Sequence, residues 1–551
     1  MTKRYIIIGG VAGGMSAATR LRRLDEHAQI TVLERGGHVS FANCGLPYYL
    51  GGVIEERGDL LLQTPDSLRH RFDLDVRVRT EAVSIDRDAK TVRVRELASG
   101  AEYDEPYDAL VLSPGATPIR PPMPGGERML TLRDIDDVDA AMAQLEVAPR
   151  TALVIGAGFI GLEMVENLRH RGLEVTLVEL ADQVLPPLDR EMAGPVAERL
   201  VQNGVDVRLG TQVTELGADF ATLSDGTTVP ADFVLGSIGV RPDTSLATAA
   251  GIEIGERGGI RVDDRLRTSD PAIWAIGDAV EKTDAVSGDQ RLIALAGLAN
   301  RHGRLAADAI AGRDVRVRDA LGTAVVGVMG LTIAATGWNE KLLQRVGREI
   351  RVIHTHPASH TGYYPGSEQM ALKLIVDAKT DEILGAQAVG GDGVDKRIDV
   401  IATAMAGNLT AADLADLELA YAPQYSSAKD PVNMLGYVDR NALEGLTPSV
   451  QWHELEAELA AGATLVDVRS RAEYEAGAIP GSILIPLDEI RARRDQLPEG
   501  KLIVHCKVGQ RGHTATRLLA QLGREAVNLD GGYLTWRAGT TEIVRERELV
   551  G

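Results

Sequence analysis

A glycine-rich strand, turn, helix and strand pattern occurs twice in the chain, and it limits the fold more than any other sequence feature. Residues 4–34 begin RYIIIGGVAGG and end ITVLE, and residues 151–179 begin TALVIGAGFIG and end VTLVE. Each copy joins an apolar strand to a helix through a tight turn, and then reaches a second strand that ends in an acid. This is the βαβ unit of dinucleotide-binding domains. The repeat predicts two Rossmann-like domains and two dinucleotides.

The first copy carries the dinucleotide fingerprint with one departure. Gly9 is placed to make the tight turn, while Gly13 and Gly14 open the helix and let it pack closely. Val11 stands where the fingerprint has its middle glycine. The helix N-terminus would present free N–H groups and a positive dipole end to a pyrophosphate. Glu34, at the end of the second strand, is placed to accept hydrogen bonds from ribose hydroxyls.

The second copy matches the fingerprint fully. Its glycines are Gly156, Gly158 and Gly161, and Glu179 ends the second strand. An acid at this point favours a nucleotide with a free ribose 2′-hydroxyl. We therefore expect NADH in preference to NADPH, with NADPH still possible.

The remaining sequence indicates four domains in a chain of 551 residues. Alternating apolar and polar residues over 76–115 predict an antiparallel meander, and a change of pattern near residue 322 predicts a separate α+β domain. The predicted fold is α/β, with two Rossmann-like domains, an α+β domain and a compact C-terminal α/β domain. The expected ranges are 1–115 with 244–321 for the first dinucleotide, 116–243 for the second, 322–441 for the α+β domain, 442–450 for a linker and 451–551 for the last domain.

Charge and cysteine content exclude several classes of function. The net charge of −20 argues against nucleic acid as the main partner. The two cysteines, Cys44 and Cys506, cannot form a disulfide framework and fit a reducing compartment. The N-terminal apolar run is too short for a signal peptide, and no stretch reaches the length of a membrane span. We expect a cytoplasmic protein that binds no membrane.

Five motifs in order resemble the flavoprotein disulfide reductases that bind two dinucleotides. They are the first glycine motif, LSPGA at 112–116, the second glycine motif, GVRPD at 239–243 and AIGDA at 275–279. The likeness covers roughly residues 1–440. It implies that the first βαβ unit binds FAD, that Asp278 holds the flavin ribitol, and that the second unit binds NAD(P)H.

Cys44 lies in SFANCGLPYYLGG, where many relatives carry a pair of cysteines separated by four residues. The second position is Tyr49 here, and Cys506 is distant in the sequence. Cys44 must therefore take its oxidised partner from elsewhere, either as a sulfenic acid or as a mixed disulfide with a small thiol.

Two single-cysteine groups remain open at this point. Peroxide- and oxygen-reducing relatives place a histidine beside the first glycine motif, but no histidine precedes His27 here. The run GGVAGG…LRRLD together with SFANCGLPYY instead resembles coenzyme A disulfide reductase. Coenzyme A is a polyanion whose phosphates need fixed cations, and arginines cluster at the end of the first helix and near residue 70.

That likeness also implies particular contacts. It assigns coenzyme A to Arg20, Arg23, Ser40, Asn43 and Arg71, although the family more often has glutamine and lysine in place of Arg20 and Arg71.

HTHPASHTGYYPG and LAYAPQYSSAKDPVN match the same family. They imply a homodimer in which Tyr363 and Tyr421, or their neighbours Tyr364 and Tyr425, reach the cysteine of the other subunit and donate protons. His354, His356 and His360 lack a nearby acid or cysteine in sequence, so we expect no metal.

TLVDVRSRAEYEAGAIPG and KLIVHCKVGQRGHTA resemble a rhodanese domain over roughly residues 447–545. Cys506 would be its nucleophile, in a loop with Lys507, Gly509 and Arg511 whose N–H groups form an anion-binding nest. Asp467 and Arg469 would brace that loop. Ala478 replaces a common histidine, and Gly512 replaces a common serine.

These resemblances imply NAD(P)H- and FAD-dependent reduction of coenzyme A persulfide, polysulfide or coenzyme A disulfide through a Cys44–S–coenzyme A mixed disulfide. Cys506 would transfer sulfane sulfur to or from coenzyme A. The fused sulfur-transfer domain favours persulfide or polysulfide as substrate. Two alternatives stay open, namely an NADH oxidase or peroxidase acting through a Cys44 sulfenic acid, and a redox-sensing or sulfur-carrier protein. The sequence fixes neither the substrate nor the direction of sulfur transfer.

Overall fold

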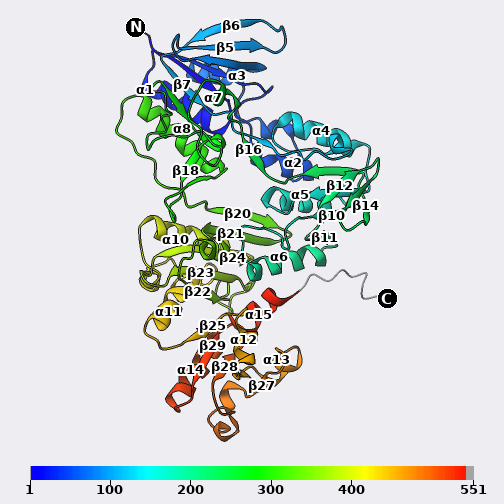
Figure 1. Ribbon diagram of the computed structural model, residues 1–551, viewed down its shortest axis with the longest axis vertical. Helices are drawn as coiled ribbons and strands as arrows, with labels where there is room; N and C mark the ends of the chain where they lie inside the picture. The colour runs from blue at the N-terminus through cyan, green and yellow to red at the C-terminus, as the bar shows by residue number, and fades with distance from the viewer. Residues whose placement is uncertain (1, 542–551) are drawn as a thin grey trace. The chain divides into compact units, whose positions relative to one another are not determined.

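The computed structural model describes residues 2–541, and the chain divides into two compact units. The first unit comprises Met1–Leu180 with Arg208–Gly322, and the second comprises Ala181–Val207 with Thr323–Gly551. Figure 1 follows the chain from the blue strands of the first unit to the orange and red elements at the C-terminal end of the second. No helix among residues 2–541 is long and apolar enough to span a membrane.

The first glycine motif lies in a five-stranded parallel sheet of order β17-β7-β1-β2-β3. Apolar runs such as RYIII and ALVL are buried, as parallel strands require when both faces are covered. Helices α1 and α8 pack so closely that a Cβ on Gly303 would lie 2.2 Å from the Gly13 carbonyl oxygen. The elements are β1 (Arg4–Ile8), α1 (Ala12–Leu24), β2 (Gln29–Leu33), β3 (Asp75–Arg77), β7 (Ala109–Leu112), β17 (Ile273–Ala275) and α8 (Ala296–Ile310).

The alternating segment between the repeats forms an antiparallel meander, as predicted. Its strands are β4 (Thr80–Asp86), β5 (Thr91–Glu96) and β6 (Glu102–Pro106). Short elements complete this part of the unit: α2 (Leu46–Gly51), α3 (Pro65–Phe72), α7 (Ser245–Ala249), the pair β8 (Ala116–Pro118) and β16 (Val240–Pro242), and the pair β18 (Glu281–Thr283) and β19 (Gln290–Leu292).

The second glycine motif lies in a sheet of order β11-β10-β9-β15. Its strands β9, β10 and β15 pair in parallel. The strands of a three-stranded sheet, β12-β13-β14, lie between β11 and β15 in the chain. The elements are α4 (Ile135–Glu146), β9 (Thr151–Ile155), α5 (Phe159–His170), β10 (Glu174–Val178), β11 (Asp206–Arg208), β12 (Val213–Leu216), β13 (Phe220–Leu223), β14 (Thr228–Pro230) and β15 (Phe233–Gly236).

The second unit contains the predicted α+β domain, whose antiparallel sheet has the order β20-β21-β24-β23-β22. Apolar residues of its strands form one core with helices α10 and α11. The elements are β20 (Ala324–Val328), β21 (Leu331–Gly337), α9 (Glu340–Arg345), β22 (Ile350–Thr355), β23 (Ala371–Asp377), β24 (Ile383–Gly390), α10 (Val394–Ala406) and α11 (Pro431–Leu443).

The C-terminal domain is a parallel sheet of order β25-β29-β28-β26-β27. Its elements are β25 (Ser449–Val450), α12 (Leu455–Ala460), β26 (Thr464–Asp467), α13 (Arg471–Glu475), β27 (Ile483–Leu484), β28 (Leu502–His505), α14 (Gln510–Gln521), β29 (Ala526–Leu529) and α15 (Gly532–Thr540). The predicted range of this domain extends to residue 551, and its last ten residues lie outside the described part.

Two boundaries differ from the expected ones. The expected linker 442–450 contains the end of α11 and strand β25, because buried Val450 pairs with Leu529 and so belongs to the C-terminal sheet. Residues 181–207, which include helix α6 (Arg190–Gln202), lie inside the expected second dinucleotide domain but belong to the second unit. Long-range polar contacts of Asp189 and Glu191, described below, explain this grouping.

Candidate active sites

The first glycine turn has the geometry that its sequence predicts. Gly9 has a φ of +98°, and a Cβ there would lie 2.0 Å from the Ser113 carbonyl oxygen. A Cβ on Gly14 would lie 1.8 Å from the Gly9 carbonyl oxygen, so helix α1 requires glycine at this contact. Val11 is the N-cap of α1, and Glu34 accepts a hydrogen bond from the Gly10 N–H at 2.8 Å. The acid therefore lies at the turn where the dinucleotide is expected.

The second glycine turn repeats this construction and leaves an open position. A Cβ on Gly161 would lie 1.9 Å from the Gly156 carbonyl oxygen, whereas a Cβ on Gly158 would meet no protein atom within 4 Å. Gly158 is the N-cap of α5, so the open space lies at a helix N-terminus, where a pyrophosphate is stabilised. Glu179 accepts a hydrogen bond from the Ala157 N–H at 2.7 Å. These residues fit a pyridine nucleotide.

Asp278 follows Gly277 in a 3₁₀ turn after strand β17, at the carboxyl end of the first parallel sheet. Ligands of doubly wound sheets bind at this edge. The Asp278 carboxylate lies 3.3 Å from the Arg133 guanidinium, a partner that the sequence analysis did not identify. This placement fits the expected contact of Asp278 with a flavin.

Cys44 lies in a one-turn 3₁₀ helix, Asn43–Gly45, that leads directly into α2. The residue is exposed, and its sulfur lies 3.8 Å from the Asn43 Oδ1. Partial burial of the thiol, followed by the negative charges of Glu163 and Asp278, raises the pKa of Cys44, while Arg133 acts in the opposite direction. The surroundings of this chain alone therefore favour the thiol over the thiolate.

Glu163 is a site residue that sequence reasoning missed. It lies on α5, the helix opened by the second glycine turn, and accepts a hydrogen bond from the Tyr48 hydroxyl at 3.1 Å. Burial raises the pKa of Glu163, and burial together with Glu163 raises the pKa of Tyr48 to about 12. The helix that follows Cys44 is thus tied to the nicotinamide-binding repeat. A motif search cannot find Glu163, because its fingerprint requires no acid at that position.

The arginines proposed for coenzyme A have different environments. Arg20 forms an ion pair with Asp308 of α8, with Nη2 2.7 Å from Oδ1, so part of its hydrogen-bonding capacity is already used. Arg22 is buried and donates to main-chain carbonyls, including that of Phe72, which gives it a structural role. Arg23 and Arg71 are exposed.

Ser40 and Asn43 flank the approach to Cys44. Ser40 has a φ of +50°, and its N–H donates to the Gly10 carbonyl oxygen at 2.8 Å. Asn43 contacts the cysteine as described above, and both side chains are half-buried. The structure therefore places Ser40 beside the first glycine turn and Asn43 beside Cys44.

Tyr363 and Tyr421 lie side by side in the second unit, with their hydroxyl oxygens 3.1 Å apart. Both are exposed, at 76% and 47% of their surface. The hydrogen bond between them lowers the pKa of Tyr363 and raises that of Tyr421. Tyr364 and Tyr425 are also exposed, but the paired hydroxyls are those of the two tyrosines that the sequence analysis favoured.

Cys506 follows buried strand β28 and opens the loop that leads to α14. The residue is fully buried, and Gly509, with a φ of +91°, caps the helix. Arg511 is held by Glu473 through contacts of 2.6 and 2.8 Å. Lys507 lies next to the cysteine in the sequence, as the expected loop requires. The cysteine, the cations and the helix N-terminus therefore lie together.

Asp467 and Arg469 form the expected brace. Both are buried, and the Arg469 Nη2 donates to Asp467 at 2.6 Å and to the Gly477 carbonyl oxygen at 2.8 Å. The guanidinium also stacks on the Tyr533 ring at 4.3 Å. Tyr533 in turn donates its N–H to the Cys506 carbonyl oxygen at 2.8 Å, so the brace reaches the loop.

The structure explains why residue 512 is glycine, whereas many rhodanese domains have serine at this position. A Cβ at this position would lie 2.2 Å from the Asn528 Oδ1. The close approach of α14 to β29 therefore excludes a larger side chain here without rearrangement of Asn528.

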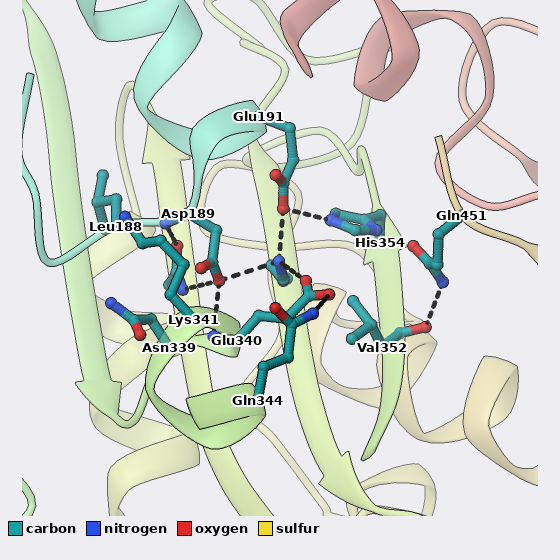
Figure 2. A network of polar contacts seen from close by, with 12 residues as sticks. Leu188, Asp189, Glu191, Asn339, Glu340, Lys341, Gln344, Val352, His354 and Gln451 are labelled. Carbon is teal, nitrogen blue, oxygen red and sulfur yellow. Dashed lines mark hydrogen bonds and ion pairs between the residues drawn. The ribbon is translucent and has the colours of Figure 1, made fainter. Parts of the chain in front are cut away.

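Asp189, Glu191 and Glu340 bring three carboxylates close enough to hold a cation. Figure 2 labels the three carboxylates, and the cation that pairs with all of them is a lysine of the protein, Lys373. The Lys373 ammonium is 2.9 Å from Asp189, 2.5 Å from Glu191 and 2.7 Å from Glu340. This lysine satisfies the carboxylates as a metal ion would.

Comparison with known proteins agrees with this geometry. Residues 3–303 match the family described as pyridine nucleotide-disulphide oxidoreductase, residues 323–431 match its dimerisation domain, and residues 451–539 match the rhodanese-like domain. Coenzyme A disulfide reductase of Staphylococcus haemolyticus (strain JCSC1435) is 33% identical over 441 residues, which cover 80% of this chain and 100% of that protein.

Two solved structures are similar over nearly the whole chain. Reduced Bacillus anthracis CoADR-RHD is 47% identical with a TM-score of 0.96, and the match covers 98% of both chains. A NAD-dependent persulfide reductase from A. fulgidus is 37% identical with a TM-score of 0.92, covering 97% of this chain and 100% of that one. A water-forming NADH oxidase from Lactobacillus brevis, at 24% identity and a TM-score of 0.77, shares the fold over 81% of this chain and 99% of that one. The chain belongs to the pyridine nucleotide-disulphide oxidoreductase family and carries a C-terminal rhodanese-like domain.

Proposed function

We propose that the protein uses NADH and FAD to reduce coenzyme A persulfide or coenzyme A disulfide at Cys44, and that Cys506 transfers the sulfane sulfur. One observation carries the proposal. The cysteine beside Asp278 and Glu163 has Tyr49 where a partner cysteine stands in many relatives, so its second sulfur has to come from a substrate. The relatives named for coenzyme A disulfide and persulfide reduction support this choice of substrate.

The chemistry at Cys44 balances with a single protein sulfur. The Cys44 thiolate attacks the inner sulfur of coenzyme A persulfide. A bond forms between the Cys44 Sγ and that sulfur, the S–S bond of the persulfide breaks, and hydrosulfide leaves. With coenzyme A disulfide as substrate, the leaving group is a coenzyme A thiolate instead. The first glycine turn, Glu34 and Asp278 would hold FAD, and the chemistry it would supply when bound is the transfer of two electrons from NADH, which would convert the mixed disulfide into the Cys44 and coenzyme A thiolates.

Residues of the chain prepare this step. The first glycine turn, Glu34 and Asp278 bind FAD, and the second turn with Glu179 binds NADH. Since Glu163 and burial raise the pKa of Cys44, the thiolate needs a compensating interaction that becomes available only when the site is filled. Arg23, Arg71, Ser40 and Asn43 contact coenzyme A, and Arg20 does so only if it leaves or shares Asp308.

The dimerisation domain supports a homodimer, in which the Tyr363–Tyr421 pair of one subunit serves Cys44 of the other. A tyrosine hydroxyl hydrogen-bonded to a second one can donate a proton to a departing thiolate.

Cys506 handles sulfane sulfur in the rhodanese-like domain. Its thiolate takes the outer, sulfane sulfur of a donor such as thiosulfate, which leaves as sulfite, and becomes a persulfide. A coenzyme A thiolate then takes the outer sulfur, which yields coenzyme A persulfide and returns the Cys506 thiolate. This reaction supplies the substrate of Cys44. We place both reactions in a reducing, cytoplasmic environment, which keeps the two cysteines as thiols.

Mass spectrometry of the protein, isolated without reductant, tests the proposal. We expect a coenzyme A adduct on the peptide that contains Cys44, and its release when NADH is added. Cys44→Ser should abolish both the adduct and NADH oxidation by coenzyme A persulfide, while Cys506→Ser should retain the adduct. The assignment would be overturned if the protein oxidised NADH with oxygen as the only acceptor as fast as it does with the sulfur substrates.

A further inference from the structure

Helix α15 holds the loop that carries the sulfur-transfer cysteine. At the start of the helix, the Tyr533 N–H donates to the Cys506 carbonyl oxygen at 2.8 Å, and the Leu534 N–H donates to the Lys507 carbonyl oxygen at 3.0 Å. A Cβ on Gly532 would lie 2.5 Å from the Cys506 carbonyl oxygen. The orientation of two peptide groups of the loop therefore depends on where α15 begins.

Residues of the dimerisation domain fix α15 near its beginning. The His354 main-chain N–H and Nδ1 lie 2.9 and 2.8 Å from the Oδ2 of Asp530, two residues before the helix. The His356 Nε2 lies 2.7 Å from the Thr535 hydroxyl in the first turn of the helix. His354 lies in β22 and His356 directly follows this strand, so both lie outside the rhodanese-like domain.

Helix α6 supports the same contact from another side. Glu191 of α6 lies 3.1 Å from the His354 Nε2, a contact that Figure 2 marks with a dashed line, and 2.5 Å from the Lys373 Nζ. Arg190, the first residue of α6, donates to the Gly539 carbonyl oxygen at 3.0 Å near the other end of α15. The helix is thus held along its length by residues that do not belong to the sulfur-transfer domain.

The charges in this cluster favour a protonated His354. Burial alone would lower the pKa of His354, but its hydrogen bonds to Asp530 and Glu191 outweigh burial and raise the pKa to about 9. Lys373 opposes this effect by its own charge. Burial, His354 and Lys507 lower the pKa of His356 to about 3, so this histidine is neutral.

A protonated His354 neutralises a carboxylate next to the reactive loop. Asp530 precedes Gly531 and Gly532, and the latter contacts the carbonyl of Cys506. Without its partner, the buried Asp530 charge would oppose the negative charge of a Cys506 thiolate or persulfide. Mere packing of two domains would not require a charged partner at this position.

We propose that His354 and His356 are positioning residues for the sulfur-transfer site, which they serve from the dimerisation domain through Asp530, Thr535 and helix α15. The proposal rests on the proposed role of Cys506 and extends it to residues of the reductase part. It makes the sulfur-transfer reaction of the fused chain dependent on β22.

The full-length protein tests this inference with two readouts. In a Cys44→Ser background, the rate of iodoacetamide alkylation across pH reports the pKa of the Cys506 thiol. The transfer of sulfur from thiosulfate to cyanide reports activity. We expect His354→Ala to raise the thiol pKa by about one unit and to slow sulfur transfer roughly tenfold, since a neutralising charge is lost.

Further variants separate charge from shape. His354→Asn retains a donor near the Nδ1 position without the charge and should raise the thiol pKa as well. The double variant His354→Asn with Asp530→Asn removes both charges and should return the pKa of the Cys506 thiol to its wild-type value. Thr535→Val removes the partner of His356 at nearly constant volume and should slow sulfur transfer with little change in thiol pKa.

The control is Glu349→Gln, which breaks an exposed ion pair with Lys379 in the same domain and should change neither readout. In the Cys44-containing chain, His354→Ala should leave flavin reduction by NADH unchanged. A folded His354→Ala or His354→Asn protein with wild-type alkylation and transfer would overturn the inference. If the unsubstituted chain transfers no sulfur, the proposed role of Cys506 fails, while the alkylation profile still decides the effect of His354.

Discussion

The Tyr48 hydroxyl donates to the Glu163 carboxylate at 3.1 Å and joins the helix after Cys44 to the helix of the second glycine turn. The cysteine and the nicotinamide-binding repeat are therefore linked by a half-buried acid. That acid also raises the pKa of Cys44.

Replacement of Glu163 by glutamine should lower the pKa of Cys44, because one negative charge near the thiol is lost. In a Cys506→Ser background, we expect alkylation of Cys44 at neutral pH to accelerate roughly threefold. Glu174→Gln, at an exposed position of the same domain, is the matched control. An unchanged pH profile for Glu163→Gln would show that Glu163 does not contribute to the pKa of this thiol.

The two helix-opening glycines of the second motif should respond differently to alanine. Gly158→Ala places a Cβ in open space at the helix N-terminus, so the melting temperature should stay constant while NADH binding weakens about tenfold. Gly161→Ala places a Cβ 1.9 Å from a carbonyl oxygen and should destabilise the fold by about 1–3 kcal/mol. Calorimetry and NADH titration measure the two effects. Equal loss of stability in both variants would contradict this distinction.

The tyrosine pair should matter for sulfur chemistry and not for hydride transfer. We expect Tyr363→Phe or Tyr421→Phe to slow turnover of coenzyme A persulfide about a hundredfold, the size of a typical proton-transfer contribution. Stopped-flow reduction of the flavin by NADH should remain at the wild-type rate. Tyr437→Phe, at a partly exposed tyrosine of α11, serves as control. Slower flavin reduction in the pair variants would argue for a structural role.

Stability of the second unit should fall at alkaline pH. The pKa of His354 rises from its ordinary 6.5 to about 9 on folding, so protonation favours the folded state. This contribution is fully present below pH 6.5 and is lost as the pH rises through about 9. It amounts to on the order of 3 kcal/mol. Chemical unfolding at several pH values should show this decline in the wild type and in His453→Asn, an exposed histidine, but not in His354→Asn.

Local patterns predicted much of the fold and of the site. The glycine motifs, the meander and the single cysteine depend on spacing within a few residues, and the family matches confirm the predicted family and fold class. Tyr363 and Tyr421 were singled out by resemblance, and the structure brings their hydroxyls together. Their role across a dimer interface stays a prediction.

Long-range polar contacts were not predictable in the same way. Lys373 pairs with Glu191 across 182 positions of sequence, and an ion pair of this kind leaves no periodic signal. The sequence showed three histidines without acids nearby, whereas the fold supplies Glu191 and Asp530 to His354. Because long-range contacts leave no periodic signal, the sequence also did not predict the pairing of Arg20 with Asp308 or the grouping of residues 181–207 with the second unit.

The contact of His354 with Asp530 also limits how such a protein can be recombined. A crossover placed at residue 450 would exchange the C-terminal domain between relatives as a self-contained cassette. It would carry Asp530 and Thr535 away from the histidines and from the α6 residues that meet them. In an active chimera, β22 and α6 would have to come from the same protein as the C-terminal domain, or would have to carry the same residues at each contact with it. The part of this chain that has to be exchanged as one unit to keep sulfur transfer is therefore larger than the domain that contains Cys506.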